Sequence, residues 1–440
     1  MAKKSSLHFI ELSRKFIQSI TTKIKYRVNE KDFTRDRKLP FETMAFCMIK
    51  LLRQSIQVEL NNYFSVSNRL KTTNMSVTSS AFVQSRKKIK PDMFYDLSKT
   101  IADDFYHYND ENVKLYKGHR VLGVDGSTLP LPLSDELIKI YGFFNNQTKT
   151  NDVVIGRVSV LYDVLNEIVL DGKLCSIKEG EVPLSREHFK YAKKGDLIIF
   201  DRAYPCFESA YNLIQLGIHG LFRCKIDFSN QVKAFYVSNK KEQTIEMRPS
   251  QNHSFEGLPY NKDSRITVRM IRIVLPSGEV EILMTTLLDN KKYLHKDFKD
   301  LYFLRWPVET FYNRFKNIIN VECFSGTSEQ FIQQEFNCAL YMSNLQSILN
   351  KEAQEEVNEK FKHRKYKYKI NTSNSLCTIR TKLVDLYTSK KESEEILQEI
   401  KTLFVRDAIP IRPGRSFIRK HDKYRTRTKP KQFNNRRTVL

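Results

Sequence analysis

Residues 197–204 read Leu-Ile-Ile-Phe-Asp-Arg-Ala-Tyr, and residues 121–127 read Val-Leu-Gly-Val-Asp-Gly-Ser. Each stretch is a short apolar run that ends at an aspartate, Asp201 in the first and Asp125 in the second. Such runs, bounded by turn residues, are typical of buried strands. Each aspartate alone could simply cap a turn. A lone carboxylate in a buried strand is unfavourable, so we expect a compensating cation near the pair.

The segments around these two strands predict an α/β protein with a ribonuclease H-like catalytic core. Strand patterns at 153–163 and 167–174 precede a helix at 181–193, and a helix at 207–216 precedes a strand at 217–225. Three strands, a helix and then strand-helix-strand is the order of that fold. Alternating apolar and polar residues between 227 and 290 predict a β-rich insertion that interrupts the core.

Changes in composition along the chain predict six regions, with helices at both ends. They are a helical N-terminal DNA-binding region at 1–115, the first part of the core at 116–226, the β-rich insertion at 227–290, the second part of the core at 291–350, a helical C-terminal region at 351–411 and a basic tail at 412–440. The charged segment 351–369 is interpreted as a connector, and the tail has too few apolar residues to fold alone.

The net charge favours a polyanionic partner. Lysine and arginine total 74 against 50 acidic residues, which leaves a formal charge of +24. That balance predicts nucleic-acid binding. No apolar run approaches the length that spans a bilayer and no secretion signal is present, so we expect a cytoplasmic protein. The seven cysteines are scattered without a C-x-x-C pair, which indicates reduced thiols and no zinc site.

A third motif, Leu-Tyr-Phe-Leu-Arg-Trp-Pro-Val-Glu-Thr-Phe-Tyr-Asn-Arg-Phe-Lys, occupies residues 301–316. Tyr302, Arg305, Glu309 and Lys316 follow the spacing Y-x2-R-x3-E-x6-K. On one helix, Glu309 and Lys316 would share a face, so the carboxylate could bind a metal while the lysine meets a phosphate. A plain amphipathic helix with an ion pair is the simpler alternative. Pro307 predicts that a helix starts or kinks there.

Two upstream aspartates with a helical glutamate suit phosphodiester chemistry. Such reactions commonly use two divalent ions roughly 4 Å apart, bridged by carboxylates at the ends of adjacent strands and on a nearby helix. Mg²⁺ prefers hard oxygen ligands, and Mn²⁺ can replace it. We therefore expect Asp125, Asp201 and Glu309 to be the catalytic residues and to bind two Mg²⁺ ions.

Taken together, these motifs resemble those of the insertion-sequence-four transposase family of bacterial insertion sequences. The resemblance rests on the four-residue signature, on Asp-Gly-Ser at 125–127, on Asp-Arg-Ala-Tyr at 201–204 and on Cys-Phe-Ser-Gly-Thr-Ser at 323–328. It spans residues 119–350. Ala203 stands where the family usually has glycine, which affects the expected turn geometry and not the chemistry.

The resemblance implies a DDE transposase that cuts DNA at transposon ends and joins them to target DNA. It implies that the two aspartates and the glutamate bind the metals and that Tyr302, Arg305 and Lys316 contact DNA phosphates. The implied partners are the terminal inverted repeats and the target DNA, held by a homodimer in a synaptic complex. A hairpin on the transposon end is also implied by the resemblance alone.

The N-terminal region contains a second candidate DNA contact. The helix expected at 77–89 ends in Arg86, Lys87 and Lys88, and another helix follows at 92–108. Two helices around a short turn favour a helix-turn-helix DNA reader, and a helical bundle with a basic surface is the equal alternative. The single tryptophan, Trp306, could stack on a base, although core packing suits its position better.

Other readings of the whole chain stay open from the sequence. A ribonuclease H-like nuclease or resolvase would share the acids, and a catalytically inactive DNA-binding relative would share the charge. A basic binding module with coincidental acids is a third reading. The nearby acids outside the motifs are interpreted as structural or solvated. They are Asp152, Asp163, Asp171, Asp196, Asp227 and Glu322.

Overall fold

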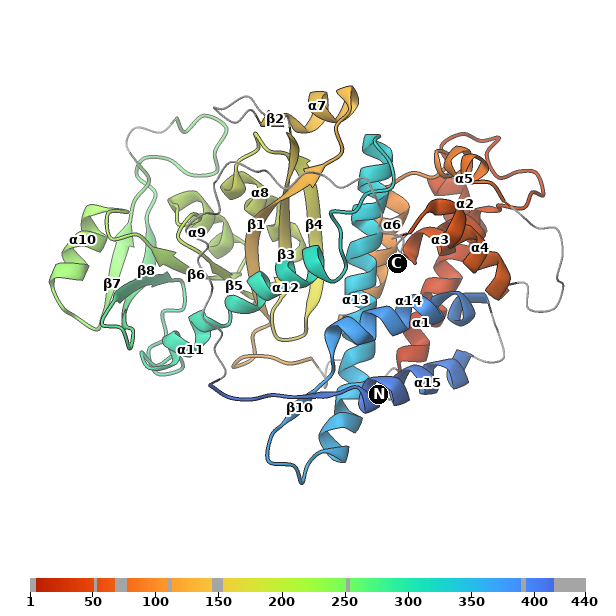
Figure 1. Cartoon of the computed structure of the whole chain (residues 1–440). Helices are drawn as coiled ribbons and strands as arrows, with labels where there is room; N and C mark the ends of the chain where they lie inside the picture. Colours follow the sequence, from red (N-terminus) through yellow and green to blue (C-terminus); the bar gives the residue numbers. More distant parts are fainter. Residues whose placement is uncertain are drawn as a thin grey trace, which may run out of the picture.

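The structure is a computed structural model, and it describes residues 5–50, 54–67, 77–108, 113–144, 153–250, 254–388 and 393–414. Figure 1 shows a large sheet at one end of the molecule, a helical bundle at the other, and the long helix α13 between them. Almost all of the basic tail, as well as Asp152, lies outside the described residues.

Within the described residues, nine strands form one mixed sheet with the spatial order β2-β3-β1-β5-β6-β9-β8-β7, and β4 pairs with β3. Strand β3 pairs antiparallel with both β1 and β4, whereas β5 pairs parallel with β1 and with β6. This is the succession expected for the core. The strands are β1 (Val121–Leu131), β2 (Phe143–Phe144), β3 (Val153–Asp163), β4 (Ile168–Ser176), β5 (Leu197–Phe200), β6 (His219–Cys224), β7 (Glu242–Met247), β8 (Ile266–Val274) and β9 (Val280–Thr285).

The segment expected as a β-rich insertion continues the core sheet. Strand β9 pairs antiparallel with β6, with Leu221 opposite Thr285, and β8 and β7 follow outward. A short helix, α10 (Asn230–Val237), precedes β7. The strand content of 227–290 is therefore as expected, but the segment adds three strands to one edge of the sheet. Hydrogen bonding to β6 covers an edge that would otherwise expose unpaired backbone groups.

Helices cover the sheet and link its strands. The bounds of those in the sheet half are α7 (Asp135–Tyr141), α8 (Glu181–Glu187), the 3₁₀ turn η1 (His188–Tyr191), α9 (Phe207–Gln215), α11 (Asp297–Phe303) and α12 (Trp306–Asn317). The expected helix at 181–193 is thus divided into α8 and η1. Pro307 occupies the first turn of α12, where its missing N–H is harmless, so a helix begins there as expected.

The N- and C-terminal helices form one bundle around α13. Their bounds are α1 (Ser6–Gln18), α2 (Ile20–Tyr26), α3 (Phe41–Ile49), α4 (Ile56–Ser67), α5 (Ser79–Arg86), α6 (Asp92–Tyr108), α13 (Glu329–Lys360), α14 (Thr372–Thr388) and α15 (Ser393–Arg406). The two-stranded pair β10 (Tyr368–Lys369) and β11 (Ile409–Pro410) closes the C-terminal region. No described helix is long and apolar enough to cross a membrane.

The central helix α13 is longer than expected. It continues through the first half of the charged segment 351–369, which was interpreted as a connector, and it ends at Lys360. Ala353 and Val357 are fully buried on this extension. Apolar residues spaced one turn apart stabilise a helix by packing, even when the remaining positions are charged. The connector interpretation is therefore wrong for residues 351–360.

Candidate active site

The two aspartates lie side by side on neighbouring parallel strands, just beyond the point where the pairing of β1 with β5 ends. Gly123 of β1 is in register with Ile199 of β5, and each aspartate lies two residues further along its strand. Parallel strands are about 5 Å apart. The two aspartates are therefore close in space. Asp125 lies within β1, and Asp201 is the first residue after β5. The topology brings together the acids of two motifs that are far apart in sequence.

Helix α12 places Glu309 over the same edge. Gly123 approaches α12 so closely that an added Cβ would lie within 3.0 Å of Cγ2 of Val308. The neighbouring residue in the first turn of the helix is Glu309. One helical turn further on, the hydroxyl of Tyr312 donates to the backbone carbonyl of Asp125 at 2.8 Å. A glycine contact and a hydrogen bond thus fix the helix against the strand on both sides of the glutamate.

The remaining signature residues contact the acids or the strand beside them. The hydroxyl of Tyr302 donates to Oδ1 of Asp201 at 3.1 Å. The guanidinium of Arg305, which is only 9% exposed, forms an ion pair with Glu309. Nζ of Lys316 donates to the carbonyl of Thr128 on β1 at 2.6 Å. The structure therefore brings the two aspartates and the four signature residues together at one edge of the sheet.

The electrostatics of the site reflect three acids held near each other. Burial raises the pKa of Asp125 to about 6, and the charges of Asp201 and Glu309 add to this rise. The N–H of Gly126 and the charge of Arg305 oppose it. Burial alone would lower the pKa of Arg305, but its hydrogen bond to Glu309 and the charge of Asp201 raise it overall. Asp125 is thus a carboxylate whose negative charge is poorly compensated by the protein.

The donor set fits a hard divalent cation in its chemistry. Three carboxylates are the ligands that Mg²⁺ and Mn²⁺ take in proteins, and a cation would offset the unfavourable charge on Asp125. Within the described residues, however, no three His, Cys, Asp or Glu side chains converge as a metal site requires. Asp201 and Glu309 are paired with Tyr302 and Arg305, so those carboxylates would have to turn to share an ion.

Sequence reasoning missed a polar group on the other side of Asp125. Glu181, at the start of α8, lies against Gly126, where an added Cβ would be 3.0 Å from Cδ of the glutamate. It forms an ion pair with Arg157 of β3. The hydroxyl of Tyr204 is buried without a hydrogen-bond partner in the described part of the chain. The Asp-Arg-Ala-Tyr motif contained that tyrosine, whereas nothing in the sequence distinguished Glu181 from a helix-start residue.

The competing acids that the structure describes in detail have structural partners. Asp163 accepts hydrogen bonds from Tyr106 and from the backbone and side chain of Asn166. Asp171 pairs with His188, and Asp196 forms a two-pronged pair with Arg120. These buried acids hold loops and strands together, in agreement with their interpretation as structural residues.

The three N-terminal candidates for DNA contact, Arg86, Lys87 and Lys88, lie in different environments in the structure. Arg86 is fully buried, where it donates to Gln334, to Ser325 and to the carbonyl of Phe331, and it forms an ion pair with Glu335. A DNA contact through Arg86 is therefore wrong, because protein atoms already occupy its guanidinium. Lys87 is exposed and Lys88 is half-buried. Successive helical residues point about 100° apart, so a basic run in sequence is not a basic patch in space.

The structure also decides two interpretations that the sequence had left open. Helix α6 would be the recognition helix of a helix-turn-helix unit, but it packs into the bundle against α13 and α1 and along β4. Its described exposed residues are Asp92, Asp103 and His107, which do not suit phosphate. The helical-bundle alternative therefore holds. Trp306 is 47% exposed, so the expectation that it packs in the core is wrong.

Two aspartates on adjacent parallel strands and a glutamate on a helix packed over them are typical of the DDE class of proteins, which is named after these three residues. Residues 116–345 match the family model described as the transposase DDE domain, and this is more than half of the chain. The chain therefore belongs to the transposase DDE-domain family.

The chain was also compared with curated proteins and with solved structures. No curated protein matches this chain. Among solved structures, a piggyBac transposase synaptic complex with hairpin DNA, determined by electron cryomicroscopy, is similar with a TM-score of 0.42 at 9% sequence identity. The match covers 92% of this chain and 87% of that one.

Proposed function

We propose that this protein is a transposase of the insertion-sequence-four type, which cleaves DNA at the ends of its element and joins them to target DNA. The observation that carries the proposal is the gathering of Asp125, Asp201 and Glu309 with the whole tyrosine-arginine-lysine signature at one sheet edge. A structural ion-pair network would not need three carboxylates whose charges oppose one another. The formal charge of +24 favours DNA as the partner.

Each residue has a distinct role in the proposed site. Asp125, Asp201 and Glu309 would hold two Mg²⁺ or Mn²⁺ ions. When bound, such ions supply activation of the attacking oxygen and stabilisation of the leaving oxygen. Tyr302 orients Asp201 through its hydroxyl, and Arg305 holds Glu309 at the start of α12. In the proposed complex with DNA, Arg305 and Lys316 also place the phosphates beside the scissile bond.

The test is a cleavage and joining assay with DNA that contains the ends of the element itself, in Mg²⁺ and in EDTA. The wild-type protein should cut and join these ends only with the metal. Asp125→Asn, Asp201→Asn and Glu309→Gln should each abolish cutting but still bind the ends. Asp103→Asn, at a largely exposed acid on α6, is the matched control and should behave as wild type.

Each contrary outcome identifies a different alternative. Cutting by any of the three site variants would refute the assignment of the acids. Cutting of random DNA without joined products would favour a nuclease or resolvase. Binding without any cutting by the wild-type protein, in either metal, would favour an inactive DNA-binding relative.

A further inference from the structure

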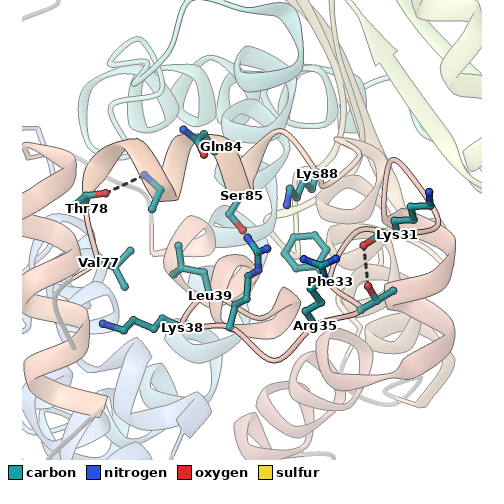
Figure 2. A pocket seen from close by; sticks show the side chains of 13 residues that line it. Lys31, Phe33, Arg35, Lys38, Leu39, Val77, Thr78, Gln84, Ser85 and Lys88 are labelled. Carbon is teal, nitrogen blue, oxygen red and sulfur yellow. Dashed lines mark hydrogen bonds between the residues drawn. The ribbon is translucent and has the colours of Figure 1, made fainter. Parts of the chain in front are cut away.

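A second charged concavity lies in the N-terminal bundle, away from the acids. Residues 31–39 form a loop between α2 and α3, and this 31–39 loop faces α5 across a cleft of about 680 Å³. Figure 1 places α5 beyond α13 from the sheet, and Figure 2 shows the cleft with the loop on one side and α5 on the other. We call this concavity the basic cleft. Its lining residues are Lys31, Phe33, Thr34, Arg35, Arg37, Lys38, Leu39, Val77, Thr78, Ala81, Gln84, Ser85 and Lys88.

The basic cleft is lined by five cations and by no acid among the described residues. The cations are Lys31, Arg35, Arg37, Lys38 and Lys88. Within the described ranges, no carboxylate lies within 4 Å of the charged groups of Lys31, Arg35 or Arg37. Of the two acids in the same loop, Asp32 is buried and lies 3.9 Å from Lys88, and Asp36 is exposed. Self-repulsion among these cations is unfavourable unless an anion offsets it.

The walls of the basic cleft are anchored. The backbone N–H of Val28 donates to the carbonyl of Lys88 at 2.9 Å, and that of Lys90 donates to Tyr26 at 2.8 Å. These bonds join the start of the loop to the chain just after α5. Inside the loop, the ring of Phe33 packs edge-on against Phe41 with centroids 5.5 Å apart. The loop that presents the cations is thus held to the end of α5 by backbone hydrogen bonds and to α3 by the Phe33–Phe41 contact.

The uncharged lining residues suit phosphate as well. Thr78, Gln84 and Ser85 contribute hydroxyl and amide groups from the side of α5. Contacts to the DNA backbone commonly combine arginine and lysine with such side chains and with helix N-termini. Thr78 is the N-cap of α5, so the positive end of that helix is at the cleft. Charge and hydrogen-bonding groups therefore favour the same chemistry.

We propose that the basic cleft is a phosphate-backbone site for duplex DNA, separate from the carboxylate site. The inference rests on the proposed function, because it assigns a second binding site for the same partner, DNA. It moves the N-terminal DNA contact from the end of α5 to the 31–39 loop, and it retains only Lys88 of the three basic residues first considered. Arg86 hydrogen-bonds α5 to α13, and this contact links the basic cleft to the half of the molecule that contains the sheet.

The experiment compares two double variants with the same change of charge. Arg35→Gln with Arg37→Gln removes two cleft cations, and Lys240→Gln with Lys241→Gln removes two exposed lysines beside β7 at the opposite end of the molecule. Binding of a short random-sequence duplex is followed by fluorescence anisotropy in EDTA across a salt series. Each lost phosphate contact reduces the log–log salt slope by about 0.9. The cleft variant should lose up to about 1.8 in slope, and the control should keep the wild-type slope.

Unfolding temperatures of both variants verify that they are folded. A cleft variant that binds like wild type, or a control that loses as much as the cleft variant, would overturn the inference. In either case a wild-type protein that binds and cuts DNA leaves the proposed function standing. Failure of the wild-type protein to bind any duplex would instead refute the proposed function, and this inference with it.

A second measurement does not depend on variants. Acetylation of exposed lysines by a reactive ester is mapped by mass spectrometry with and without the duplex. Bound duplex should protect Lys31 and leave Lys240 reactive. ATP tests the other source of phosphate, since the cleft volume falls within the range of roughly 300–1,000 Å³ that is common for small-ligand pockets. Protection of Lys31 by ATP and not by the duplex would show a nucleotide site and overturn the inference.

Discussion

Gly123 on β1 and Val308 on α12 lie so close together that no side chain fits between them. This contact determines how near the glutamate of the helix comes to the aspartate of the strand, because Glu309 follows Val308 and Asp125 lies two residues after Gly123. A methyl group at position 123 would meet a branched side chain that is fully buried and has little room to move.

The first prediction tests this contact. Gly123→Ala should displace α12 and slow cleavage by on the order of a hundredfold, because misplacement by about 1 Å can reduce a rate that much. DNA binding should persist. Val308→Ala removes the opposing methyl groups, so the double variant Gly123→Ala with Val308→Ala should recover much of the rate. Single-turnover cleavage of pre-bound ends measures both. A double variant slower than Gly123→Ala alone would mean that the contact does not position the helix.

The second prediction concerns Lys316 and Arg305. Lys316→Ala should slow cleavage severely while the protein stays folded, because the hydrogen bond to Thr128 contributes only roughly 0.5–1.5 kcal/mol. Arg305→Lys should also slow cleavage, since an ammonium cannot reproduce a two-pronged guanidinium. Lys139→Ala, at an exposed lysine on α7, controls for the loss of charge. Single-turnover rates near wild type for both variants would leave the signature without a role in the chemistry.

The third prediction follows from the pKa of Asp125, which burial raises to about 6. Between the unfolded value near 4 and pH 6 the folded state binds more protons, so its stability falls as the pH rises through this window. Without metal at pH 8, Asp125→Asn should therefore be more stable than wild type by about 2–3 kcal/mol. The difference should vanish near pH 4. Urea unfolding in EDTA measures it, and a destabilised Asp125→Asn at pH 8 would contradict the burial argument.

The fourth prediction separates Arg86 from its neighbour. Arg86→Met removes hydrogen bonds to Gln334 and Ser325 and leaves Glu335 without its buried partner, so unfolding should become easier by about 3–5 kcal/mol. Lys87→Met, at the exposed adjacent position, should change stability by less than about 0.5 kcal/mol. Urea denaturation of both proteins is the measurement. Equal stability for the two variants would show that Arg86 is not a structural tie.

The sequence by itself determined the succession of core elements, and it pointed to the three acids of the proposed site. Buried strands such as 197–200 are continuous apolar runs, and an aspartate directly after such a run is visible without any structure. Pro307 predicted that a helix starts or kinks at that position, and α12 begins at Trp306. These features are local, because strand and helix periodicity and proline geometry act over a few residues.

Only the tertiary structure decided which residues meet across the fold. Arg86, Lys87 and Lys88 are neighbours in the chain, yet one is buried against α13 and another lines the basic cleft, because helical side chains diverge and α13 packs on one face only. Residues 227–290 were predicted to be a β-rich insertion, but their pairing partners leave no local pattern, and only the structure shows β9 joining β6 across about 60 positions. The sequence did not indicate a role for Glu181 or Arg35 for the same reason. What surrounds a charged residue is set by segments far along the chain, and burial and pairing determine whether that residue stabilises the fold or binds a partner.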